Sequence, residues 1–137
     1  MQVCIHRGSR EIGGSCVEVI SAGKRIVIDL GLPLDVEKND KKYLPKISGL
    51  DGDDDSLMAV FISHPHLDHF GLLGHISGKI PVIMGIDARR ILTQASPFLP
   101  GNWPIPANGL NLKSEIPLEV GPFKITPFLI DHSGYDA

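Results

Sequence analysis

Short apolar runs separated by glycine-bearing turns predict that the first part of the chain is a small β-meander. Runs rich in Val and Ile at residues 1–5, 16–20 and 25–30 are typical of antiparallel strands. The turn at residues 21–24 would join the last two strands as a hairpin. The alternation then stops, and prolines, lysines and an acidic cluster predict a long surface loop over residues 32–55.

A β-α-β unit is predicted in the middle of the chain. A strand at residues 57–62, a short helix at 70–77 and a strand at 80–84 would form it, and such a crossover implies locally parallel strands. A second helix should follow, because apolar residues recur at helical spacing at Ala88, Ile91, Leu92 and Ala95. Pro97 limits the extension of this helix.

The last part of the chain predicts an irregular stretch and then a hairpin. Residues 97–109 have no periodic pattern, whereas residues 115–120 and 123–129 would pair around the turn at 121–122. Together these elements predict the α/β (α+β) class, with a mixed sheet and flanking helices.

Composition narrows the class of protein. The 137 residues make one domain at most, and 42% hydrophobic residues with a formal charge of -3 indicate a globular chain. No apolar run approaches the roughly 20 residues that span a bilayer, and no secretory signal pattern opens the sequence, so we expect no membrane partner and a cytoplasmic location. The cysteines Cys4 and Cys16 are too few for a disulfide framework, and we expect both to be buried.

Three imidazoles and a carboxylate crowd into the segment that follows the strand at 57–62. Imidazole nitrogens and carboxylate oxygens suit zinc and similar divalent ions. Pro65 keeps His64 extended, so His64 and His66 should project to the same side. A polar turn is the plain alternative, but the spacing of these side chains favours a metal site, formed by His64, His66, Asp68 and His69.

The pattern His-x-His-x-Asp-His in this segment resembles the metal-binding signature of the metallo-β-lactamase superfamily. The resemblance implies the N-terminal half of an αββα sandwich. It also implies that His64 and His66 share one metal with a later histidine, for which His132 is the candidate. Asp68 and His69 would serve a second metal, and Asp68 would be the catalytic residue that orients the attacking water. The implied metal is zinc, as one or two ions, with manganese as an alternative.

Three further carboxylates could orient metal-bound imidazoles through hydrogen bonds, and they are Asp29, Asp131 and Asp136. For Asp29, which ends an apolar strand, the capping of a turn is an equal alternative.

Shorter motifs are similar to the start of ribonuclease J and the cleavage-factor nucleases, and they are residues 8–16, 28–31 and 131–133. This similarity implies a metal-dependent hydrolase that uses metal-activated water on RNA phosphodiester bonds, with RNA as the partner of the complete enzyme. A hydrolase of small thioesters or lactones and a catalytically silent metal-binding fragment remain open as alternatives. The glycine-rich run at 8–16 can also be a flexible turn.

The resemblance also implies a carboxylate that bridges both metals from a later strand, and this sequence has no candidate for it. We therefore expect residues 1–137 to form a single, truncated domain. A fragment of a two-sheet sandwich exposes apolar sheet surface, so we expect a homo-oligomer or other association through that face.

Overall fold

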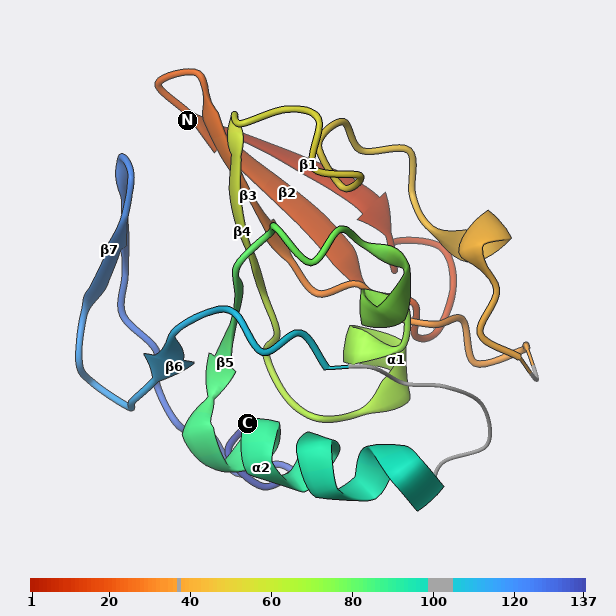
Figure 1. The fold of residues 1–137 in the computed structure, drawn as a ribbon. Coiled ribbons are helices and arrows are strands. Elements are labelled where there is room, and N and C mark those ends of the chain that lie inside the picture. Colours follow the sequence, from red (N-terminus) through yellow and green to blue (C-terminus); the bar gives the residue numbers. More distant parts are fainter. Residues whose placement is uncertain (37, 99–104) are drawn as a thin grey trace.

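The computed structural model describes residues 1–36, 38–98 and 105–137. Its centre is a mixed six-stranded sheet with the strand order β1-β2-β3-β4-β5-β6 (Figure 1). The strands of this sheet are β1 (Gln2–Arg7), β2 (Cys16–Ser21), β3 (Lys24–Ile28), β4 (Leu57–Phe61), β5 (Val82–Gly85) and β6 (Asn111–Leu112). A separate two-stranded sheet consists of β7 (Leu118–Val120) and β8 (Phe123–Ile125).

The predicted N-terminal meander is confirmed, because β1, β2 and β3 pair antiparallel in chain order. Ser21 pairs with Lys24 across a two-residue turn in which Ala22 and Gly23 have φ values of 48° and 72°. Two successive positive φ values are typical of the type I′ turn, whose twist matches that of the strands on either side.

The second half of the sheet is parallel, as the β-α-β pattern predicted. β3 pairs parallel with β4, β4 with β5 and β5 with β6, although the short strand β6 was not predicted. The second helix is confirmed as α2 (Ile86–Ala95), and a 3-10 turn, η3 (Ser96–Phe98), continues it at Pro97. The predicted irregular stretch lies partly at residues 99–104, outside the described residues.

The predicted helix at 70–77 was wrong at its start. Instead, α1 (Leu67–Phe70) begins directly after His66, and a 3-10 turn, η2 (Leu73–His75), follows it. Gly71 is the C-cap of α1, and a Cβ at this position would lie 2.4 Å from the Leu67 carbonyl oxygen and 2.6 Å from the Leu32 Cβ. Among the described residues, no helix has the length and apolar character needed to cross a membrane.

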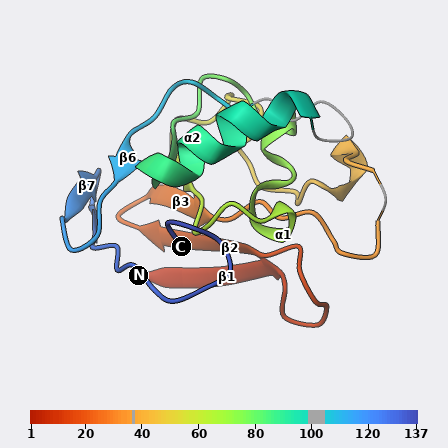
Figure 2. The same ribbon diagram turned by 90° about the horizontal axis from the view of Figure 1, so that it is seen from below.

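Apolar side chains pack on both faces of the sheet. On one face, Val27, Val60 and Val82 meet Leu92 of α2, and Figure 2 shows α2 lying across this side. On the other face, Ile26, Ala59, Phe61 and Ile83 meet Phe123 of the β7–β8 hairpin. The sheet is therefore an inner layer, with helices on one face and the start of further β-structure on the other.

The loop at residues 32–55 is only partly a surface loop. Its apolar residues Leu32, Ile47 and Leu50 are buried in the helix-side core, and these contacts anchor the described parts of the connection. It contains a 3-10 turn, η1 (Lys41–Tyr43), at which Asp40 accepts a hydrogen bond from the Lys42 amide.

The two cysteines lie in different environments. Cys16 is buried as expected, and burial raises the pKa of its thiol to about 12, so that it stays protonated. The expectation for Cys4 was wrong, because this residue is exposed on β1, the edge strand of the sheet. Of the residues that the structure describes, none packs over this part of β1, where residues 2–5 are all exposed.

Candidate metal centre

The histidine-rich segment lies where β3 and β4 end, at the carboxyl edge of the parallel part of the sheet. β4 ends at Phe61, and the chain then turns sharply, with the His66 amide donating to the His64 carbonyl at 3.0 Å. His66 keeps an extended backbone and directly precedes α1, whose first turn carries Asp68 and His69. The carboxyl edge of parallel strands is where open α/β folds place their ligands.

His64, His66 and His132 come together although His132 lies far along the chain. One ring nitrogen from each lies within 4.8 Å of the other two, and the Nε2 atoms of His64 and His132 are 3.1 Å apart. His64 is buried, His66 is half-buried and His132 is exposed. A Cβ on Gly134 would lie 3.3 Å from both His64 Cδ2 and His66 Nε2, so glycine allows the His132 segment to approach the other two rings. The structure thus brings together the three histidines that the resemblance implied.

Asp68 and His69 lie beside this trio but do not join it among the described residues. The ring centroids of His69 and His64 are 3.9 Å apart, and Asp68 Oδ2 lies 3.5 Å from His69 Nε2. The free nitrogen of His69 and the carboxylate of Asp68 therefore face each other next to the histidine trio.

Asp29 supports the segment from the end of β3. Its buried carboxylate accepts hydrogen bonds from the Ser63 amide at 2.8 Å and the Ser63 hydroxyl at 2.9 Å. It also lies 2.7 Å from Nδ1 of His69. Asp29 has a φ of 63°, a left-handed conformation that Asp and Asn tolerate better than other residues with a side chain. Asp29 thus orients His69, which the sequence left open between this role and a turn cap.

The residue that connects these groups, Ser63, was missed at the sequence level. Its hydroxyl lies 3.0 Å from Nδ1 of His64 and 3.2 Å from Nδ1 of His69, and it donates to Asp29. Only its position directly before His64 could have indicated this role, and serine is common in turns for many other reasons.

Burial and neighbouring charges act on the imidazoles in opposite ways. Burial, with the adjacent histidines, lowers the pKa of His64 to about 4, so this ring is neutral near pH 7 and has a free nitrogen for a metal. Burial also lowers the pKa of His69, but the hydrogen bond and charge of Asp29 and the charge of Asp68 outweigh it, and the net shift is upward. The pKa shifts of His64 and His69 therefore have opposite directions.

Asp136 does not orient a histidine. Its carboxylate accepts hydrogen bonds from the Asp87 and Ala88 amides at 2.9 and 3.2 Å, and so it caps the N-terminus of α2. For Asp131, no hydrogen bond to a described imidazole is present. Asp131 and Asp136 line a cavity beside His132 together with Asp87.

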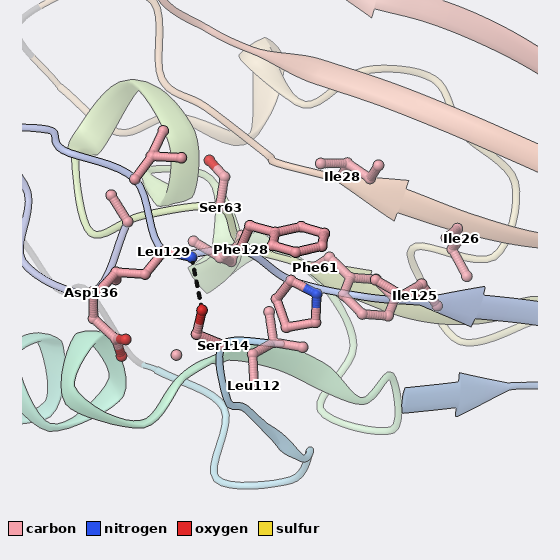
Figure 3. A pocket seen from close by; sticks show the side chains of 15 residues that line it. Ile26, Ile28, Phe61, Ser63, Leu112, Ser114, Ile125, Phe128, Leu129 and Asp136 are labelled. Atoms are coloured by element: carbon pink, nitrogen blue, oxygen red, sulfur yellow. Dashed lines mark hydrogen bonds between the residues drawn. The ribbon is translucent and has the colours of Figure 1, made fainter. Parts of the chain in front are cut away.

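An apolar groove of about 280 Å³ lies between the face of the sheet opposite α2 and the C-terminal segment, and it reaches Ser63 next to the histidines. Figure 3 shows Ile28, Phe61 and Phe128 around it, with Ser63 toward one end. The dashed line in that view is the hydrogen bond from the Leu129 amide to the Ser114 hydroxyl at 3.0 Å, which holds the C-terminal segment over the groove.

Two proteins with similar sequences are named as an RNase or as RNase-like. The RNase J-like protein of Methanocaldococcus jannaschii is 38% identical over 68 residues, which are 50% of this chain and 14% of that protein. RNase aCSPSF2 of Saccharolobus solfataricus is 32% identical over 92 residues, covering 64% of this chain and 17% of that protein. The chain thus spans less than a fifth of the length of these two relatives.

Solved structures share the fold. A protein of unknown function from Enterococcus faecalis V583 superposes with a TM-score of 0.77 at 23% identity, over 98% of this chain and 39% of that one. The subclass B3 metallo-β-lactamase MEM-A1, from a soil metagenome library, gives 0.57 at 22% identity, over 83% of this chain and 45% of that one. The family model described as "Metallo-beta-lactamase superfamily" matches residues 10–123. The chain therefore belongs to the metallo-β-lactamase superfamily.

Proposed function

We propose that this chain carries the metal-binding part of a hydrolase that cleaves RNA phosphodiester bonds with metal-activated water. The observation that carries the proposal is the convergence of His64, His66 and His132 within 4.8 Å. Three imidazoles are the ligand set of several catalytic zinc sites, in which a fourth position stays open for water or substrate.

Each residue of the centre has a role in this proposal. His64, His66 and His132 would hold the first ion through their ring nitrogens, and Asp68 and His69 would contribute to a second. Bound divalent ions would lower the pKa of water and offset negative charge on the phosphoryl oxygens. Asp68 orients the attacking water, while Asp29 fixes the His69 ring so that Nε2 stays available. Zinc fits this His-rich donor set, and manganese is the alternative.

RNA is proposed as the substrate because the relatives are named as an RNase J-like protein and an RNase. Since the chain spans only part of their length, the activity of a whole protein is part of this proposal. A cytoplasmic location is also part of this proposal.

A small thioester or lactone is the second candidate substrate. The apolar groove favours it, because a cavity of about 280 Å³ that reaches Ser63 has room for a short acyl chain beside the histidines. A catalytically silent metal-binding fragment is the third interpretation. Among the described residues, no carboxylate joins the histidine trio, so the ligand set for two metals is incomplete there.

Association between copies is also proposed. Val3 and Ile5 on the edge strand and Phe128 to Ile130 in the C-terminal segment expose apolar side chains. Such surface favours contact with another subunit, and light scattering on the purified chain would measure it.

The decisive experiment measures bound metal by plasma mass spectrometry and then hydrolysis by the metal-loaded chain. A single-stranded RNA and a short acyl thioester serve as parallel substrates. Cleavage of RNA alone supports the proposal, and cleavage of thioester alone favours the second candidate. Bound metal without turnover of either substrate means a silent fragment, and a chain that takes up no zinc or manganese overturns the metal centre itself.

A further inference from the structure

The loop between β1 and β2, residues 8–15, lies directly beside the candidate metal centre. The Ser15 amide donates to the Asp68 carbonyl at 3.0 Å, and a Cβ on Gly13 would lie 3.0 Å from the Cβ of Asp68. Gly13 and Gly14 have φ values of 76° and 64°, which glycine adopts without strain. The loop therefore contacts the turn that carries Asp68, and Figure 1 shows it next to α1.

An ion pair between Arg7 and Glu11 at the base of the loop holds the loop in place and balances the charge of Glu11. Arg7 donates from Nε and Nη2 to the two carboxylate oxygens of Glu11, at 3.1 and 2.9 Å. Its Nη1 donates to the Tyr43 carbonyl at 2.9 Å, which connects the loop with the long connection after β3. The hydrogen bond from Arg7 lowers the pKa of Glu11, whose charge is thus balanced within the pair.

Arg10 is the remaining charged group of this loop. It is exposed, and it has neither an ion pair nor a hydrogen bond to any residue in the described ranges. Two positions further on, the apolar side chain of Ile12 is 84% exposed. A guanidinium beside an exposed apolar side chain can contact both the phosphate and the sugar or base of a nucleotide.

The side of the centre next to His132 is acidic. Asp87, Asp131 and Asp136 line the cavity there, and Arg90 forms an ion pair with Asp87. On the other side of the centre, the loop that contacts the acidic Asp68 presents the exposed Arg10. A polyanion should therefore approach along the loop, where Arg10 can pair with it, and not over the carboxylates beside His132.

We propose that Arg10 pairs with a backbone phosphate of a single-stranded nucleic acid and so positions the strand at the metal centre. The inference rests on the proposed function, because it identifies how the substrate of that same site is held. Arg10 acts here as a binding residue, and the contact does not depend on base identity.

Salt-dependent binding of labelled oligonucleotides tests this contact without turnover. Fluorescence anisotropy would follow a short fluorescein-labelled oligouridylate and an oligoadenylate on the 137-residue chain in EDTA. The variants are Arg10→Ala, Arg10→Lys and the control Lys79→Ala, which removes an exposed cation before β5, at the other end of the parallel strands. Circular dichroism confirms that each variant is folded.

One lost phosphate contact has a defined signature in these data. For single strands, the slope of log affinity against log salt concentration changes by about 0.7 for each phosphate contact. The ratio of the affinity of the unmodified chain to that of Arg10→Ala should therefore decrease about 2.6-fold between about 50 and 200 mM salt. The loss should be equal for both oligonucleotides, Arg10→Lys should retain most of the slope, and Lys79→Ala should leave it unchanged.

Each other result identifies what has failed. The loop contact is overturned if the unmodified chain does not bind the oligonucleotides, or if Arg10→Ala has the same salt dependence of affinity as the unmodified chain. Either result holds whatever the metal and hydrolysis assays show. A flattened slope for Arg10→Ala together with no RNA cleavage by the metal-loaded chain retains the contact and overturns the hydrolase.

Discussion

Replacing Asp29 by asparagine should weaken metal binding at His69 more than at the histidine trio. The carboxylate has two oxygens that serve three donors, namely the amide and hydroxyl of Ser63 and Nδ1 of His69. Asparagine keeps the shape and tolerates the φ of 63°, so the Asp29→Asn chain should fold. It has one acceptor oxygen, and its amide nitrogen cannot accept the hydrogen bond that His69 Nδ1 donates.

The expected size of the effect follows from that lost hydrogen bond. A hydrogen bond to a charged group contributes about 1.5–3 kcal/mol, which corresponds to roughly a 10- to 150-fold change in an equilibrium constant. Loss of a carboxylate behind a metal-bound histidine costs a similar factor of about 10–100 in affinity. His64 is one hydrogen bond further away, through Ser63, so the trio should lose much less.

Zinc titration in competition with a chromophoric chelator would resolve the two binding constants. The matched control is Asp53→Asn, which removes the same charge from an exposed position near the end of the long connection. Unchanged constants for Asp29→Asn, or equal weakening of both positions, would show that Asp29 does not act through His69.

Three further changes test other parts of the structure. His64→Ala should abolish metal uptake at the trio while the circular dichroism spectrum is retained, and an unchanged zinc stoichiometry would refute that role. Burial lowers the pKa of His64 to about 4 in the folded chain, whereas the value in the unfolded chain is near 6.5. As the pH falls, the unfolded metal-free chain therefore binds a proton at His64 before the folded chain does. The free energy of unfolding should decrease by up to about 3 kcal/mol as the pH falls from about 6.5 to about 4. Urea unfolding at several pH values would measure this acid limb, which His64→Ala should lack; an identical limb in both proteins contradicts the assignment. Gly31→Ala should destabilise by about 1–3 kcal/mol, because its Cβ would lie 1.7 Å from the Asp68 carbonyl oxygen. Gly78→Ala, with nothing within 4 Å, is its control, and equal unfolding midpoints would show that the contact at Gly31 relaxes freely.

Much of the sheet could be predicted because its periodicity is local. The alternation in β2 and β3 and the Ala22-Gly23 turn between them each depend on a few neighbouring residues. The grouping of His64 and His66 is local for the same reason, since Pro65 limits the backbone between them.

Features that depend on distant contacts could not be predicted in this way. The burial of Ile47 and Leu50 requires the helix-side core to be present, and β6 has only two residues and forms by pairing with β5. The start of α1 at Leu67 has no side-chain cap to mark it in the sequence. Instead, the Leu32 amide donates to the Leu67 carbonyl and so holds the helix against the chain that leaves β3.

The position of His132 shows how far the metal centre depends on such tertiary contacts. His132 lies after β8 in a segment without helix or strand, so no regular element fixes its ring. The Asp136 carboxylate instead binds the N-terminus of α2, and it sits so close to Gly85 that a Cβ there would lie 2.1 Å from an oxygen of Asp136. The Ile130 amide closes the same segment by donating to the Ala137 carbonyl at 3.0 Å. The third histidine is therefore positioned by α2 and the end of β5, whereas the other two are positioned by the turn after β4, and the centre forms only when these parts of the fold are packed together.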